Sequence, residues 1–479
     1  MKHLTIDKIM LPLPRPQYVP SPESLITALA WNVFDVELRQ NANGKQTALI
    51  FRGKPSETKT LEYRVSAPND DNLNVLAQAL DQEKLKPTIS KTVVAQAVLN
   101  SIEGIKTSKG NGRPASPLTP SMALLQNIHG LMGTANPPSV DGMLEMLYRV
   151  GMPQRESSEG PAMLWVNAVN HRMDEDQLLG ALDRAIDGSL LESPRRMRNS
   201  VKAEIRQTDA EPWQGLMDDT PYEWFYHAWN RLTSVEWVEA LPSRVWVDWA
   251  TTILRLAVGC GYLWEAAWFE TLARQILGAD PANWKSTKSK VGQVIPWPSA
   301  RAKMSIRDVS STLTWRVRRA DEIRERLKIW LKDSKRAASL FDEGIETMRV
   351  DPELRDSMAK ILSSRNHTSR GTNRWEAIKY SLVTRETDGQ FADYYGLLKS
   401  HGARGRYLTV DPGTEWIAVV ASLACNGPGT TTDVGTVMKA LESLGLFPEL
   451  GDLVALLERA GLARDSADAD QGVRVQSAF

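Results

Sequence analysis

The hydrophobic pattern near the start of the chain has a period of two. Between Trp31 and Ala67, apolar and polar residues alternate in three runs, AWNVFDVELRQ, QTALIFRG and KTLEYRVSA. The pair Asn43-Gly44 separates the first two runs, and such a pair is typical of a tight β-hairpin. The pattern therefore predicts a three-stranded antiparallel meander. The Pro-rich residues 1–20 are expected to form an extended arm.

Farther along the chain, most apolar positions follow a helical period. The clearest stripe has steps of three and four and consists of Trp246, Trp249, Ile253, Leu256, Cys260 and Leu263. Such a stripe is the buried face of a helix. Gly259 and Gly261 interrupt it, so the sequence predicts two helices, over about 243–258 and 262–278.

The pattern as a whole predicts a mainly α fold (α+β) with a small N-terminal antiparallel β-meander, a Trp-rich helical middle and a separate C-terminal module. Five segments are expected: an α+β domain over 1–104, a basic Gly/Ser/Pro linker over 105–120, a Trp-rich helical domain over 121–300, a basic helical region with Arg/Gly loops over 301–410, and a C-terminal domain over 411–479.

The C-terminal module contains three helical patterns followed by two short strands. The helices are expected in GTEWIAVVASLACNG, in TTTDVGTVMKALESLGL with Thr431 or Thr432 as the N-cap, and in PELGDLVALLERAGL. A strand at ARDS, a turn at ADADQG and a strand at VRVQSAF follow. This order, and the LERAGLARD junction above all, resembles a winged helix-turn-helix domain. The resemblance implies contact with duplex DNA through the third helix.

The charge of the third helix does not suit that contact. The helix carries Glu449, Asp452 and Glu458 against a single Arg459, and the predicted wing after it adds Asp465, Asp468 and Asp470. Phosphate contact needs Lys or Arg, because carboxylates repel the DNA backbone. We therefore expect Glu449, Asp452 and Glu458 to contact a partner protein. Direct DNA reading, or a different helical fold, are the alternatives.

Positive charge gathers in two other places. Twelve Lys or Arg lie between residues 301 and 336 against five acids, and Arg-rich loops follow between 364 and 406. Basic helices and Gly/Ser/Arg loops suit a phosphate backbone. The alternatives are a solvated helix with Glu–Arg pairs, or surface loops. The candidate nucleic-acid contacts are Arg316, Arg318, Arg319, Arg370, Arg374, Arg404 and Arg406.

Tryptophan is unusually frequent in this chain. There are 16 Trp, and ten of them lie between residues 213 and 297. Their helical spacing favours core packing. Since Trp dominates binding hot spots, a docking surface for a partner protein is the functional alternative, with Trp224 and Trp229 as its candidates.

Overall charge and cysteine content limit the function classes. The 479 residues include 58 Lys plus Arg and 58 Asp plus Glu, so nucleic-acid contact must come from local patches. Two cysteines, Cys260 and Cys425, build neither a disulfide framework nor a zinc cluster, which favours a reducing cytoplasm. The chain has no apolar run long enough to span a membrane and no signal-peptide pattern. A cytoplasmic protein without membrane contact is expected.

The sequence offers little catalytic chemistry. The six histidines never pair at i+3 or i+4, and the glycine-rich phosphate loop and the nucleophile elbow are missing. We therefore expect no metal, no cofactor and no catalytic residue in this chain.

These features predict a non-catalytic, nucleic-acid-associated subunit of a prokaryotic multi-protein complex. Other subunits would bind the chain, and DNA or RNA would contact its basic patches. Antiviral defence against phage and DNA processing are the expected settings. Two alternatives stay open: a protein-interaction scaffold without nucleic-acid contact, and an enzyme whose active site is made of scattered residues.

Overall fold

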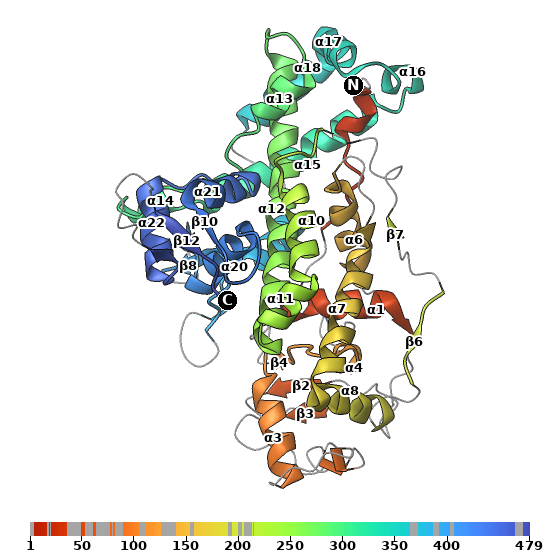
Figure 1. Ribbon diagram of the computed structural model, residues 1–479. Coiled ribbons are helices and arrows are strands. Elements are labelled where there is room, and N and C mark those ends of the chain that lie inside the picture. Colours follow the sequence, from red (N-terminus) through yellow and green to blue (C-terminus); the bar gives the residue numbers. More distant parts are fainter. Residues whose placement is uncertain are drawn as a thin grey trace.

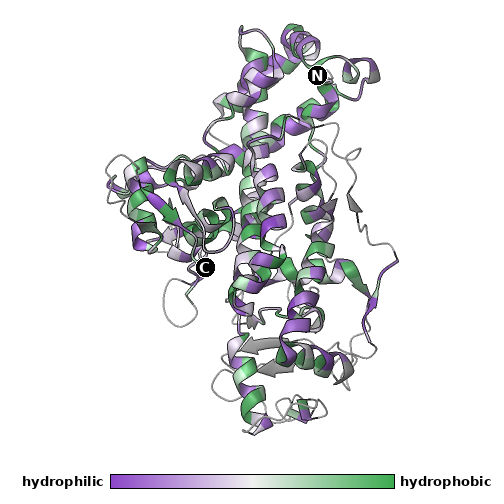
Figure 2. Ribbon diagram, in the orientation of Figure 1, coloured by the Kyte–Doolittle hydropathy of each residue, from purple (hydrophilic) through white to green (hydrophobic). Residues whose placement is uncertain are grey.

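The computed structural model is mostly helical, which confirms the prediction of a mainly α fold (Figure 1). It describes residues 4–16, 19, 21–35, 49–52, 61–63, 77–78, 80–81, 90–104, 112–125, 140–153, 158–189, 194–199, 204–205, 213, 215–364, 372–386, 392–402, 407–464 and 473–479. Along the ribbon, many helices change repeatedly between hydrophilic and hydrophobic residues (Figure 2), as amphipathic helices with one face in the core do.

One long helix, α12 (Ser243–Leu277), runs through the middle of the molecule (Figure 1). It is continuous across Gly259 and Gly261, so the prediction of two helices was wrong. A Cβ at position 259 would lie 2.3 Å from Leu382 Cγ. This glycine permits the close approach of a neighbouring helix and does not end its own.

Other helices surround α12 and share its core. Those that pack directly on it include α6 (Val140–Val150), α10 (Pro221–Leu232), α15 (Ser310–Trp330), α17 (Phe341–Val350), α18 (Pro352–Ser363) and α19 (Thr372–Leu382). The other helices before the C-terminal region include α3 (Lys91–Ser101), α4 (Pro120–Leu125), α7 (Pro161–Glu175), α8 (Gln177–Ser189), α11 (Val235–Ala240), α13 (Trp284–Ser289), α14 (Met304–Arg307) and α16 (Ser334–Ala337). One continuous hydrophobic core extends from Ile6 to Val475 and contains the predicted stripe of α12.

The N-terminal arm packs along α12. It begins with the short helix η1 (Ile6–Ile9) and continues without regular structure, with Leu11 and Leu13 buried. The indole Nε1 of Trp268 donates to the Ile9 carbonyl at 3.1 Å. The extended arm is therefore confirmed for residues 11–16, whereas Ile6–Ile9 form a 3-10 helix that was not predicted.

The strands of the N-terminal half do not form the predicted meander. Trp31 lies in helix α1 (Glu23–Val33), not in a strand. The pairs are β1 (Phe34–Asp35) antiparallel with β6 (Arg196–Met197), β5 (Ser158–Glu159) antiparallel with β7 (Glu204–Ile205), and β2 (Leu49–Arg52) parallel with β3 (Leu61–Tyr63) and antiparallel with β4 (Gly112–Pro114). The expected hairpin at Asn43-Gly44 lies outside the described residues.

The reason for this error is general. Alternation marks a strand but does not specify its partner or its direction. The segment Gly112–Pro114 became a strand although its composition predicted a linker over 105–120, and Ala115 and Ser116 after it are buried. Residues 105–111 are not described.

The C-terminal region has the three predicted helices, α20 (Thr414–Ala424), α21 (Val434–Ser443) and α22 (Leu450–Arg459). They pack with a three-stranded antiparallel sheet of order β10-β12-β11, formed by β10 (Thr431–Asp433), β11 (Ala463–Arg464) and β12 (Arg474–Gln476). The hairpin β8 (Leu398–His401) with β9 (Tyr407–Val410) precedes them. Thr431 and Thr432 belong to β10, and the N-cap of α21 is Asp433, whose carboxylate accepts from Thr436 N.

Candidate functional site

The exposed side of α22 combines acids with apolar side chains. Glu449 and Glu458 are exposed, as the sequence required of docking residues. Phe447 and Leu450, at the entrance of the helix, are 41% and 57% exposed. Exposed apolar side chains beside carboxylates suit contact with a protein and not with phosphate.

Asp452 has a different environment from the other two acids. Its Oδ2 accepts a hydrogen bond of 2.9 Å from the backbone N–H of Ala300. Just before Ala300, Val294 N donates to Gly445 O at 2.9 Å, and Ile295 forms a bridge with Leu446. The segment over 294–300 therefore attaches α22 to the helical body, and Asp452 contacts this chain itself.

Two of the predicted nucleic-acid contacts, Arg316 and Arg319, bind a carboxylate of α12. Their guanidinium groups lie 3.3 and 3.4 Å from the side chain of Glu270, which is almost fully buried. Arg316 also donates to the backbone carbonyls of Gln293 and Val294. Both arginines face the protein interior, so we remove them from the candidate phosphate contacts.

Arg374 is also internal. It is 7% exposed, and its two terminal nitrogens bind Glu265 at 2.8 Å and Asp321 at 2.7 Å. Burial raises the pKa of the Glu265 carboxyl, and the nearby Arg374 opposes this rise. An arginine held by two carboxylates in the core cannot reach a phosphate, so this prediction is corrected as well.

The remaining predicted arginines are less well defined. Arg318 is half-buried on α15. Arg370, Arg404 and Arg406 lie outside the described residues, so their candidacy stays a prediction.

Some basic side chains near the end of α15 do face solvent. Between residues 325 and 336 the exposed basic residues are Arg326, Lys328, Lys332, Lys335 and Arg336. Two exposed acids, Glu325 and Asp333, lie in the same stretch. Helical patterns alone do not show which basic residues have internal partners. For this reason the sequence favoured the internal Arg316, Arg319 and Arg374, and these exposed residues were missed.

An unpredicted ion pair joins α12 to a loop near the C-terminal region. Arg255 Nη1 and Nη2 each lie 2.9 Å from one oxygen of Asp393, and both residues are buried. Arg255 also donates to the carbonyls of Ser381 and Val383. In sequence, Arg255 stands among apolar residues without a nearby acid. Its partner is 138 residues away, so only the folded structure reveals the pair.

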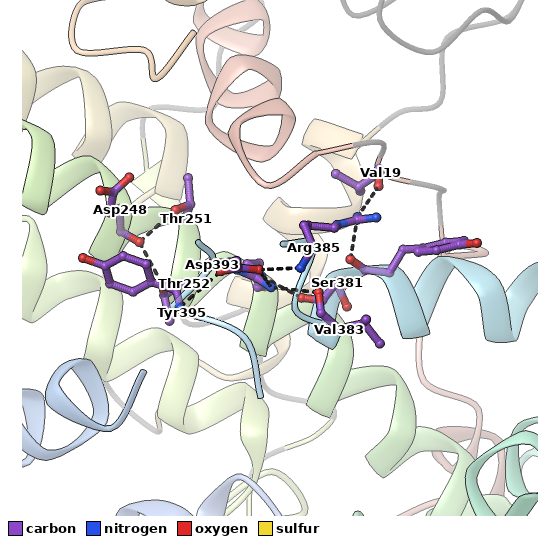
Figure 3. Close-up of polar contacts among 11 residues, drawn as sticks. Val19, Asp248, Thr251, Thr252, Ser381, Val383, Arg385, Asp393 and Tyr395 are labelled. Atoms are coloured by element: carbon purple, nitrogen blue, oxygen red, sulfur yellow. Dashed lines mark hydrogen bonds and ion pairs between the residues drawn. The ribbon is translucent and has the colours of Figure 1, made fainter. Parts of the chain in front are cut away.

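Asp393 is the centre of a larger polar cluster (Figure 3). Besides Arg255, its carboxylate accepts from the backbone N–H groups of Arg385 at 3.1 Å and Tyr395 at 3.2 Å. Asp248 lies near Tyr395 in this view, and burial raises the pKa of its carboxyl, an effect that Arg244 opposes. Both carboxylate oxygens of Asp393 thus accept hydrogen bonds from within the chain, so the cluster supports the fold.

The two tryptophans proposed for partner docking belong to the core. Trp229 is fully buried and its Nε1 donates to the Pro161 carbonyl at 3.0 Å, and Trp224 is 8% exposed. The docking prediction for both is corrected, because neither ring presents a face to a partner. The alternative that their helical spacing favoured, core packing, is confirmed.

Metal-binding groups, membrane-spanning helices and similar proteins give little further information about the function of the chain. Among the described residues, no three His, Cys, Asp or Glu side chains are grouped to hold a metal ion. Within the same residues, no helix has the length and apolar character that crossing a bilayer requires. No known family model matches the sequence, and no curated protein is significantly similar to it.

Proposed function

We propose that the chain is a non-catalytic subunit of a multi-protein complex and that its C-terminal region is a winged helix that docks a partner protein. The observation that carries this proposal is the exposed surface of α22, which combines the apolar Phe447 and Leu450 with the acidic Glu449 and Glu458. The element order α20, β10, α21, α22, β11, β12 supports the winged-helix assignment.

The position of α22 also supports protein docking. Its Asp452 contacts the segment over 294–300, so part of the helix already serves as a protein-binding surface within the chain. The exposed remainder offers the apolar Leu450 at its start, with Phe447 just before the helix, and the carboxylate of Glu458 near its end. Apolar centres with polar rims are the usual composition of protein interfaces.

The test is assembly in the native host with a tagged chain. Phe447→Asp combined with Leu450→Asp should abolish co-purification of the partner and leave the melting temperature unchanged, since both side chains are exposed. Val350→Asp is the matched control, because Val350 is an apolar residue that is 79% exposed on another part of the molecule. Equal partner recovery with all three proteins would refute docking through α22.

Nucleic-acid contact is a second candidate function, and the exposed basic residues near the end of α15 favour it. Lys328 is exposed in the last turn of α15, and Lys332 is exposed two residues beyond the end of that helix. Replacing both with Gln should weaken binding to all sequences alike. The plot of the logarithm of the binding constant against the logarithm of salt concentration should also become less steep, by about one unit of slope for each phosphate that the variant no longer neutralises.

The control for this test is the exposed Lys360 on α18. Lys360→Gln should leave both the affinity and the salt slope as in the wild type. If the chain binds neither duplex nor single strands at low salt, the protein-interaction scaffold without nucleic-acid contact is the correct alternative. The setting in phage defence or DNA processing remains a prediction from the sequence.

A further inference from the structure

Arg172, near the end of α7, is a buried cation that forms no ion pair with a carboxylate of the described residues. It is 8% exposed, and its Nε and Nη2 are buried without a hydrogen-bond partner in the described part of the chain. The charge of Asp176 raises the pKa of Arg172 in part, but the Asp176 carboxylate accepts from the backbone N–H groups of Leu178 and Leu179 and forms no ion pair with the guanidinium that the described structure shows. A buried, unpaired guanidinium is costly and calls for a compensating charge.

The guanidinium of Arg172 lies against the first turn of α12. Its Nη1 donates to Ser243 Oγ at 3.3 Å, and its Cζ lies 5.1 Å from the centroid of the Trp246 ring. The contact with Trp246 is a cation–π interaction, which stabilises the charge only in part. Burial lowers the pKa of Arg172 to about 10, so the side chain is still charged at neutral pH.

The start of α12 adds positive potential at the same place. Within the described residues, no side chain caps this 35-residue helix, whose N-cap is Pro242. The first N–H groups of a helix lack intrahelical acceptors, and they carry the positive end of the helix dipole. A cation beside this end is repelled by it, so an anion bound between the guanidinium and the helix end would be stabilised by both.

We infer that Arg172, Ser243 and the first-turn N–H groups of α12 bind a small oxyanion with the chemistry of a phosphate group. A phosphate has enough oxygens to accept from the guanidinium, the hydroxyl and the helix amides together. Because Arg172 is buried, the ligand is a free phosphate or a terminal phosphomonoester and not an internal phosphodiester. This site is separate from α22, and the proposed docking function does not depend on it.

Isothermal titration with inorganic phosphate, at constant ionic strength in a chloride buffer, tests the inference. The wild type should bind one phosphate, and Arg172→Met should weaken binding by about tenfold to a hundredfold, the value of charged hydrogen bonds. Ser243→Ala should weaken it less. Arg274→Gln is the control, because Arg274 is exposed at the other end of α12 and should leave binding unchanged.

Melting temperatures give a second test, because the inference predicts the direction in which each should change. In phosphate-free buffer, Arg172→Met should melt at the wild-type temperature or above it, since the substitution removes an uncompensated buried charge. Added phosphate should raise the melting temperature of the wild type and not that of the variant. If Arg172→Met fails to fold, Arg172→Lys keeps the charge without the planar donor group and should also bind phosphate more weakly.

Two ligands distinguish the sources of the phosphate. An oligonucleotide with a 5′-phosphate that binds more tightly than its 5′-hydroxyl counterpart, dependent on Arg172, would identify a polynucleotide end. Arg172-dependent binding of inorganic phosphate alone would identify a free phosphate. If wild type and Arg172→Met respond equally to every ligand, Arg172 is a cation–π contact only and the inference is wrong.

Discussion

Arg255 and Asp393 form a two-point ion pair in the core, with both nitrogen–oxygen distances at 2.9 Å across 138 residues of sequence. The pair connects the central helix α12 to the loop before β8. Since both side chains are almost fully inaccessible to solvent, removal of one partner leaves a buried charge without compensation.

We therefore expect Asp393→Ala to lower the free energy of unfolding by about 3–5 kcal/mol. Replacing both residues, as in Arg255→Met with Asp393→Leu, should cost less than the single change, because no charge is then left unpaired. Urea denaturation of the wild type and these two variants measures the difference. The exposed pair Lys290–Asp280 is the control, and Lys290→Ala should leave the transition unchanged.

Gly259 should resist substitution although it lies within a helix, where alanine is normally the better residue. Because its Cβ would overlap Leu382, Gly259→Ala should cost about 1–3 kcal/mol of unfolding free energy. A Cβ at Gly451, on α22, would meet no atom of the described chain within 4 Å apart from its chain neighbours and the helix's own backbone, so Gly451→Ala should be neutral or slightly stabilising. Equal effects at the two positions would show that α12 and α19 do not approach closely.

The tryptophan stripe of α12 should be essential for folding. Trp246 and Trp249 are fully buried, and Trp→Ala at either position should cost about 3–5 kcal/mol. Trp315 is 37% exposed on α15, so Trp315→Ala is the control and should change stability little. Thermal unfolding monitored by circular dichroism compares the three. Wild-type melting of the Trp246 and Trp249 variants would contradict the core assignment.

The N-cap of α21 should make a pH-dependent contribution. Hydrogen bonds from the Thr436 hydroxyl and backbone N–H hold the pKa of the Asp433 carboxyl below its usual value. This contribution is therefore present at neutral pH and disappears as the pH falls through the lowered pKa. Asp433→Ala should cost about 0.5–2 kcal/mol at pH 7.

The difference in stability between the wild type and Asp433→Ala should shrink progressively below about pH 4, the ordinary range of an Asp carboxyl. Asp433→Asn serves as the control, since asparagine caps a helix but does not titrate. Its difference from Asp433→Ala should stay constant over the same pH range. A constant difference for the wild type as well would show that the Asp433 carboxylate does not cap α21.

Local pattern was sufficient to predict several elements. The helices of the C-terminal region and the burial of the α12 stripe follow from periodicity, because a helix repeats its environment at a constant interval. Periodicity did not predict that α12 continues through Gly259, since the reason for this glycine is Leu382, more than a hundred residues away. It did not predict the parallel pairing of β2 with β3 either.

For the candidate sites, residue type was determined by the sequence and residue role by the tertiary structure. The sequence alone predicts that α22 is acidic and partly apolar, because the spacing of residues along a helix determines which of them lie on its exposed face. Whether an arginine binds a phosphate or a carboxylate depends on what the fold brings to it. Glu265 and Asp321 reach Arg374 from two other helices, and the start of α12 reaches Arg172. Charge acts through space, and only the folded chain defines those distances.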